Sequence, residues 1–126
     1  MNKEKIIYKD LSYKIVGLAM DVYNELGFGF LEKVYENALM VLLRKAKISS
    51  KQQCDISVYF QNEEVGRYCA DIIIEDKIIL EIKSVEKIID AHRAQTLNYL
   101  KATGIKLAII INFGKEKLEY ERLCYG

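Results

Sequence analysis

The first part of the chain shows a helical period of apolar positions. Three- and four-residue steps predict one apolar face of a long helix, formed by Ile7, Leu11, Ile15, Ala19, Val22 and Leu26. The GFG sequence at 27–29 is expected to end this helix, because glycine readily adopts the left-handed conformation that follows helix ends. A second helix is predicted from about residue 31 to residue 46, with an apolar stripe of Val34, Ala38, Val41 and Leu42.

The apolar period then changes to two, which predicts strands. QQCDISVYF (52–60) alternates, QNEE (61–64) is typical of a turn, and GRYCADIII (66–74) and KIILEIK (77–83) predict two further strands. A helix is expected from about 88 to 102, ended by Gly104. KLAIIIN (106–112) is apolar throughout, as in a strand covered on both faces, and KLEYERL (117–123) predicts an edge strand.

The element order is therefore α, α, β, β, β, α, β, β. This order predicts an α/β (α+β) fold, in which a mixed sheet is flanked by helices. The chain contains no proline and shows no repeat or low-complexity segment, so we expect one domain over residues 1–126.

Three ionisable residues interrupt the apolar strands. Because side chains alternate along a strand, Glu81 and Lys83 share one face of IILEIK (78–83). A three-residue loop at EDK (75–77) would pair Ile74 with Ile78, Ile72 with Leu80, and Asp71 with Glu81. Opposed Cβ atoms lie about 4.5–5.5 Å apart, so two carboxylates there repel each other unless a cation lies between them.

Two alternatives stay open at this point. A two-residue loop would place Asp71 and Glu81 on different faces of the sheet. Glu81 and Lys83 could also form a salt bridge on a solvent-facing side, with Asp71 as a charge at the strand edge. Taken together, an acidic strand end and a Glu-x-Lys at hairpin distance favour a site. Lys83 is one candidate for the balancing cation, and a divalent metal is a better one.

Composition narrows the chemistry. The hydrophobic share of 51% and the charged share of 29% are typical of a globular protein, and no stretch has the length of a signal peptide or a membrane span, so we expect a cytoplasmic protein without membrane contact. The 3 cysteines have no CxxC spacing and are expected to be reduced thiols. With only 1 histidine, a metal must be held mainly by oxygen. The net charge of +1 does not indicate a binder of polyanions.

These residues resemble the PD-(D/E)XK nuclease superfamily. Asp71 followed by Glu81-Ile82-Lys83 resembles its signature, and the order over residues 31 to 112 fits its restriction-endonuclease-like core. GFLEKVY (29–35) resembles the motif that names the GxxExxY protein family, and GRYCAD (66–71) resembles that family's second block. Ala70 replaces the proline of the superfamily's name and leaves the acidic residue intact.

The resemblance implies a role for each matching residue. Asp71 and Glu81 would be ligands of Mg²⁺ or Mn²⁺, joined by the backbone carbonyl of Ile82 and by Glu32 as a further carboxylate. Lys83 would orient or activate the attacking water and stabilise charge on the phosphate. Independent of the resemblance, hard divalent cations prefer carboxylate oxygens, and such an ion lowers the pKa of a bound water.

Further polar residues lie at helical spacing. His92, Gln95 and Tyr99 share one helix face, and Gln95 and Tyr99 match the Gln-x-x-x-Tyr pattern of the exonuclease-like branch. They are candidates for substrate binding, and the alternative is a polar patch packed against the sheet edge. Tyr35 is a further candidate, for which a packed ring with a hydrogen-bonded hydroxyl is the preferred interpretation.

The leading functional hypothesis is a metal-dependent nuclease that hydrolyses phosphodiester bonds of DNA or RNA. The alternative is a catalytically inactive nuclease fold that binds nucleic acid or protein, and a structural role in a homo-oligomer or larger complex is a third. A nuclease of long duplex DNA usually has a basic face. Because the net charge is near neutral, a small, single-stranded or partner-delivered substrate is as plausible as long duplex DNA.

Overall fold

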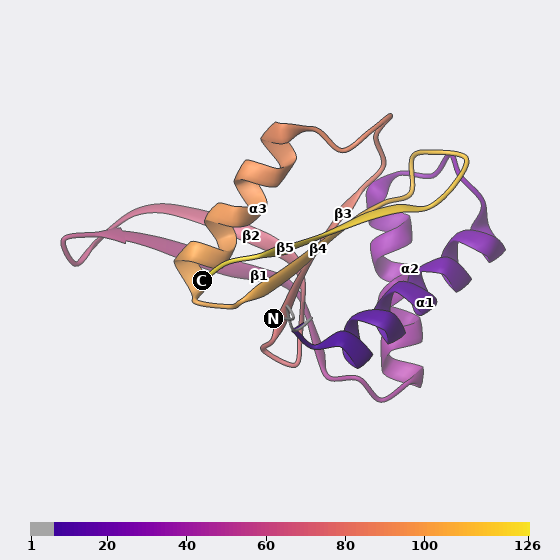
Figure 1. Ribbon diagram of the computed structural model, residues 1–126, viewed down its shortest axis with the longest axis horizontal. Helices are drawn as coiled ribbons and strands as arrows, with labels where there is room; N and C mark the ends of the chain where they lie inside the picture. Colours follow the sequence, from indigo (N-terminus) through magenta and orange to yellow (C-terminus); the bar gives the residue numbers. More distant parts are fainter. Residues whose placement is uncertain (1–6) are drawn as a thin grey trace, which may run out of the picture.

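A computed structural model describes residues 7–126. The elements are α1 (Lys9–Leu26), α2 (Glu32–Lys45), β1 (Ser50–Phe60), β2 (Glu63–Ile74), β3 (Ile78–Lys83), α3 (Asp90–Thr103), β4 (Leu107–Asn112) and β5 (Glu119–Cys124). The predicted order of helices and strands is confirmed (Figure 1). Within the described residues, no helix has the length and apolar content needed to cross a membrane.

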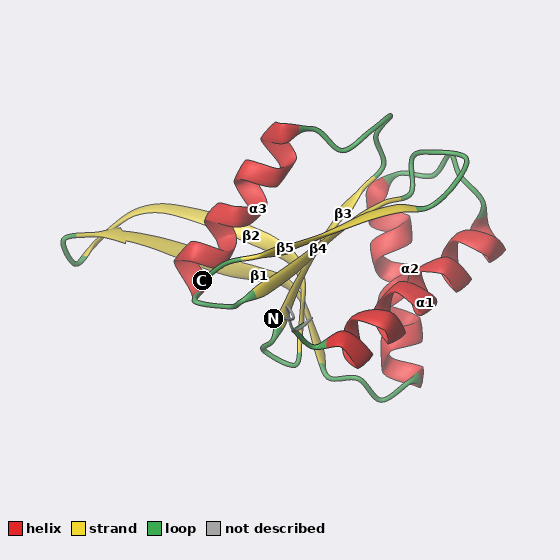
Figure 2. Cartoon of the chain, viewed as in Figure 1, coloured by secondary structure: helices red, strands yellow, loops and turns green. Residues whose placement is uncertain are grey.

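The five strands form one mixed sheet in the order β1-β2-β3-β4-β5. Only β3 and β4 are parallel, because α3 connects them as a crossover; the other neighbours are antiparallel. Figure 2 shows α1 and α2 on one side of the sheet and α3 on the other. The interior strand β4, between β3 and β5, is buried at every position, as the all-apolar run at 106–112 predicts.

Two apolar clusters fill the layers on either side of the sheet. The larger joins α1 and α2 to the sheet through residues that include Ile15, Leu39, Ile72 and Leu80. The smaller packs α3 on the other face and includes Ile79, Leu100 and Ala108. Consecutive residues Ile79 and Leu80 thus face opposite clusters, which is the alternation expected of a doubly covered strand.

The β2–β3 turn has the predicted length and register. Residues 75–77 connect the strands, and the pairs Ile74/Ile78 and Ile72/Leu80 are confirmed. Glu75 and Asp76 have φ of 50° and 56°, a left-handed conformation that acidic and amide residues tolerate in turns. The loop therefore sets a register that brings Asp71 beside Glu81.

The expected element ends differ from the structure at several places. The QNEE turn is shorter than predicted. Within residues 61–64, only Gln61 and Asn62 have a positive φ, and β2 starts at Glu63 instead of residue 66. β1 starts at Ser50 instead of 52, and α1 starts at Lys9, so Ile7 precedes the helix. α3 begins at Asp90 instead of about 88, because the backbone of Ile89 is extended.

Candidate metal centre

β2 and β3 separate at Asp71 and Glu81, where side chains replace the regular ladder. The last regular pair is Ile72/Leu80. Beyond it, the N–H of Ile82 donates to Asp71 Oδ2 at 2.7 Å, and the N–H of Asp71 donates to Glu81 Oε2 at 3.1 Å. Each carboxyl group is therefore fixed through one oxygen, and its second oxygen is left for another partner.

Burial makes this carboxyl pair electrostatically costly. Glu81 is only 4% exposed, and burial together with the charge of Asp71 raises its pKa to about 8. Burial also raises the pKa of Asp71, although the hydrogen bond from the Ile82 N–H acts against this rise. A pair of this kind is relieved by binding either a proton or a cation.

Lys83 lies at the end of β3, half-buried, and its charge lowers the pKa of both Asp71 and Glu81. Among the ion pairs within residues 7–126, none joins Lys83 to either carboxylate. The alternative of a Glu81–Lys83 salt bridge on a solvent-facing strand is therefore wrong. The ammonium group is near the acidic pair without being bound to it.

Glu32 approaches the same region from the first turn of α2. Its Oε2 accepts a hydrogen bond from the N–H of Ser84 at 3.3 Å, which joins the start of α2 to the end of β3. A cavity of about 520 Å³ is lined by Leu31, Glu32, Lys33, Glu36, Gln53, Asp71 and Ser84. Glu32 and Asp71 thus face one cavity, and the charge of Glu32 contributes to the raised pKa of Asp71.

Two residues at this cavity were missed by sequence reasoning. Glu36 is 3% exposed, and its Oε2 accepts hydrogen bonds from Gln52 Nε2 at 2.6 Å and Gln53 Nε2 at 2.8 Å. The four-residue step from Glu32 to Glu36 places both on one helix face and could have indicated Glu36. The left-handed φ of 55° at Gln53, inside β1, has no sequence signal.

Tyr35 supports the loop that precedes α2. The ring is fully buried and stacks on Phe113 with centroids 4.4 Å apart. Its hydroxyl donates to the carbonyl of Gly27 at 2.7 Å and accepts from the N–H of Phe30 at 3.1 Å. The substrate-binding assignment of Tyr35 is corrected accordingly, because a fully buried side chain offers no surface to a substrate.

The three candidates on α3 have different environments. Tyr99 is 4% exposed and its ring packs in the smaller cluster; burial and the nearby Glu81 charge raise its pKa to about 12. Gln95 is exposed. His92 Nδ1 accepts the N–H of Ile89 at 3.1 Å and caps α3. Burial and then the charge of Lys83 lower the pKa of His92, which places its ring near the candidate centre.

The donor chemistry of this region suits a hard divalent cation. Mg²⁺ is commonly bound through one or two carboxylates, with water and substrate oxygens completing its shell. Asp71 and Glu81 supply two such groups with no cation bonded to them within the described residues. Across residues 7–126, however, no three His, Cys, Asp or Glu side chains are arranged to hold one ion. The structure thus assembles a carboxylate pair, and Glu32 stands apart on its hydrogen bond to Ser84.

Comparisons with known proteins identify the superfamily and the fold. The model of the PD-(D/E)XK nuclease superfamily matches residues 9–123. The crystal structure of SSO0001 is similar, with a TM-score of 0.59 and 16% sequence identity over 93% of this chain and 57% of that chain. The chain therefore spans 57% of SSO0001, and the likeness shows the fold alone. The comparison with curated proteins gives no match. The mixed sheet between α1–α2 and α3 is the restriction-endonuclease-like core, and the chain belongs to the PD-(D/E)XK nuclease superfamily.

Proposed function

We propose that this protein is a metal-dependent nuclease that hydrolyses phosphodiester bonds of DNA or RNA. The observation that carries the proposal is the contact between Asp71 and a buried Glu81 whose pKa is raised to about 8. A fold does not gain stability from a buried carboxyl group beside a second, half-buried one, so this pair at a strand junction is typical of a functional site. Membership of a nuclease superfamily supports the same reaction class.

The residues that would hold the ion are Asp71, Glu81 and the backbone carbonyl of Ile82, with Mg²⁺ or Mn²⁺ as the metal. Glu32 is a further carboxylate that lines the same cavity as Asp71. When bound, a divalent ion supplies Lewis-acid chemistry: it lowers the pKa of a water and neutralises phosphate oxygens. The chain's own contribution is to hold two carboxylate oxygens in place through the N–H groups of Ile82 and Asp71.

Lys83 is the residue proposed to act on the phosphate and the attacking water. Its charge reaches both carboxylates without an ion pair to either, so the ammonium group keeps its hydrogen-bond donors for a substrate. A positive charge beside the transferring phosphate stabilises the negative charge that develops there. His92, whose ring is also near Lys83, and exposed Gln95 are proposed to line the path of the substrate.

Within the superfamily, we assign the chain to the GxxExxY protein family. Gly29, Glu32 and Tyr35 provide the residues of the name. Each has a distinct place: Gly29 has φ of 117°, Glu32 lines the cavity, and Tyr35 bonds the loop that contains Gly29. We thus propose that the motif forms the loop before α2 and the first turn of α2, which together present the carboxylate of Glu32.

A second candidate function is a non-catalytic nuclease fold that binds nucleic acid or protein. One observation favours it: no three metal-binding side chains converge within residues 7–126. In that case Glu81, whose pKa is raised to about 8, would keep its proton at neutral pH, and no ion would be needed.

Cleavage of labelled single- and double-stranded oligonucleotides separates the two candidates. We expect Mg²⁺- or Mn²⁺-dependent products from the wild type, none in chelator, and a loss of roughly 100-fold or more in Lys83→Met. Lys14→Met, which removes an exposed lysine on α1, is the matched control and should cleave normally. Equal cleavage by wild type and Lys83→Met would assign any products to a contaminating nuclease, and no products under any condition would favour the non-catalytic function.

A further inference from the structure

The loop between α1 and α2 exposes three large apolar side chains in four residues. Phe28 is 59% exposed, Phe30 is 46% exposed and Leu31 is 80% exposed. Scattered apolar residues are normal on protein surfaces, but a contiguous group commonly marks a binding site. We define Phe28, Phe30 and Leu31 as the aromatic loop.

Hydrogen bonds fix the aromatic loop in place. The Tyr35 hydroxyl bonds both Gly27 and Phe30, and the Ser84 hydroxyl donates to the carbonyl of Phe30 at 3.1 Å. The loop is thus tied to α2 on one side and to the end of β3 on the other. Such a held surface loses little conformational entropy when it binds a ligand.

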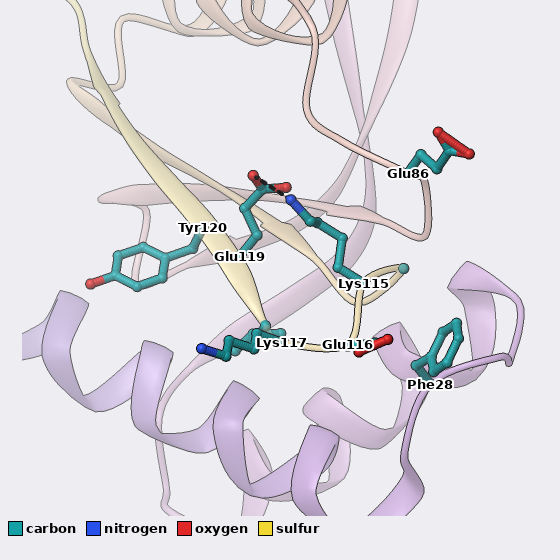
Figure 3. Close-up of a pocket in the computed structure, with 9 residues that line it drawn as sticks. Phe28, Glu86, Lys115, Glu116, Lys117, Glu119 and Tyr120 are labelled. Atoms are coloured by element: carbon teal, nitrogen blue, oxygen red, sulfur yellow. Dashed lines mark ion pairs between the residues drawn. The ribbon is translucent and has the colours of Figure 1, made fainter.

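The aromatic loop is continuous with the candidate metal centre. Leu31 lines the cavity that contains Asp71 and Glu32. On the other side, Phe28 lines a second cavity, of about 800 Å³, with the 114–120 segment and Glu86. Figure 3 shows the ring of Phe28 beside the loop that bears Lys115, Glu116 and Lys117. Exposed apolar side chains therefore extend from Leu31 at the candidate centre to the ring of Phe28, beside a rim that contains two lysines.

We propose that the aromatic loop stacks unpaired bases, so that the substrate is single-stranded nucleic acid or an unpaired end. The inference rests on the proposed nuclease function and names the substrate class of that same site. Proteins that bind single strands combine aromatic platforms with cationic side chains. Bases in a duplex already stack on one another and offer no free face to a ring.

Charge distinguishes this substrate from long duplex DNA. The net charge of the chain is +1, and the cavity beside Phe28 contains Glu86, Glu116 and Glu119 as well as Lys115 and Lys117. Lys115 also pairs with Glu119 at 3.7 Å. Attraction to phosphates alone is therefore weak at this surface, and stacking must provide a large share of the affinity. Binding should accordingly depend only shallowly on salt.

The test is fluorescence anisotropy with a labelled single-stranded oligonucleotide, its duplex, and an abasic strand of equal length. Measurements with Mg²⁺ in the Lys83→Met background avoid consumption of the probe. We expect the single strand to bind more tightly than the other two probes. Phe28→Leu, which stays apolar but cannot stack a base, should weaken binding to the single strand roughly 5- to 100-fold, whereas Phe28→Tyr should retain it.

Tyr13→Leu is the matched control. Tyr13 is 83% exposed on α1 and lies about 20 Å along the helix axis from the C-terminal end of α1, where the aromatic loop begins. It should leave binding unchanged. A duplex preference, equal binding of the abasic strand, or unchanged affinity in Phe28→Leu would overturn the inference. If the affinity of Phe28→Leu is unchanged, metal-dependent cleavage by the wild type would still support the proposed nuclease function. Absence of both binding and cleavage would overturn the inference and the proposed function together.

Discussion

The environment of Glu81 is unlike that of an ordinary surface carboxylate. It is buried, accepts a backbone N–H from Asp71, and lies beside a second carboxyl group. Its raised pKa means that the folded protein resists the ionised form. The side chain is therefore expected to limit stability for the sake of chemistry.

Glu81→Gln tests this trade-off. The amide keeps an oxygen that can accept the Asp71 N–H and removes one of two like charges. We expect the metal-free variant to be at least as stable as the wild type at pH 8, with a gain of about 1 kcal/mol. Chemical denaturation of both proteins in chelator measures the difference. A loss of about 3–5 kcal/mol would instead show that Glu81 is the counter-ion of a buried cation.

The pH dependence of stability follows from the same carboxyl group. Its pKa is about 8 in the folded protein against an ordinary value of 4.5, so between these values the folded state retains a proton that the unfolded state has released. The stabilisation from this proton is complete below about pH 4.5 and is lost as pH rises through about 8. In chelator, the wild type should lose stability between pH 5 and pH 9. Glu81→Gln should lose less over that range, and parallel curves for the two proteins would contradict this assignment.

At the scale of elements, the end of β4 positions the segment that leaves β3. Asn112 is fully buried; its Oδ1 accepts the N–H of Val85 at 3.0 Å and its Nδ2 donates to the Val85 carbonyl at 2.9 Å. Gly114 lies so close that a Cβ there would overlap the backbone of Ser84 and Val85. Ser84 in turn bonds Glu32 and Phe30. The position of Ser84, and of the contacts it makes, therefore depends on this packing.

Gly114→Ala should disrupt that contact. Because backbone atoms of Ser84 and Val85 cannot move aside as a flexible side chain can, we expect a destabilisation of about 1–3 kcal/mol, together with a loss of the proposed nuclease activity. Gly17→Ala is the matched control: no atom lies within 4 Å of its added Cβ, and alanine favours a helix interior by about 0.5–1 kcal/mol. In thermal unfolding, the melting temperature should fall in Gly114→Ala and rise in Gly17→Ala. Equal shifts of the melting temperature in the two variants would contradict the packing argument.

Sequence patterns predict the elements well where one local rule governs them. The three-residue loop at 75–77 sets the register of β2 and β3, so the proximity of Asp71 and Glu81 follows from counting residues. The apolar run at 106–112 predicts a doubly covered strand because only burial on both faces favours it.

Features that depend on tertiary contacts could not be predicted in this way. Tyr99 has the same helical spacing as a substrate-facing residue, yet the packing of α3 against the sheet buries its ring beside Tyr68. The burial of Glu36 depends on two glutamines of β1, one of which has a left-handed backbone. Sequence spacing places a residue on a helix face, whereas its burial is decided by the element that covers the face.

At the scale of the whole molecule, the proposed metal binding would be coupled to folding through the carboxyl pair. The pair joins β2 to β3 in the middle of the sheet, so unfolding separates the two proposed ligands. An ion bound only by the folded state stabilises it by mass action, about 2.7 kcal/mol at 100 times the dissociation constant. We expect Mg²⁺ or Mn²⁺ to raise the melting temperature of the wild type but not that of Asp71→Ala. Equal shifts in both proteins would indicate a nonspecific effect of the ion.

The most direct test of the central claim is isothermal titration calorimetry of Mn²⁺ binding at pH 7, in buffers of different ionisation enthalpy. Because the pKa of Glu81 is about 8, the metal-free protein retains a proton on this group at pH 7, and a metal that binds Asp71 and Glu81 must displace it. The account predicts saturable binding by the wild type with release of about one proton, and no binding by Asp71→Ala. Absence of binding by the wild type, binding without proton release, or equal binding by Asp71→Ala would contradict it.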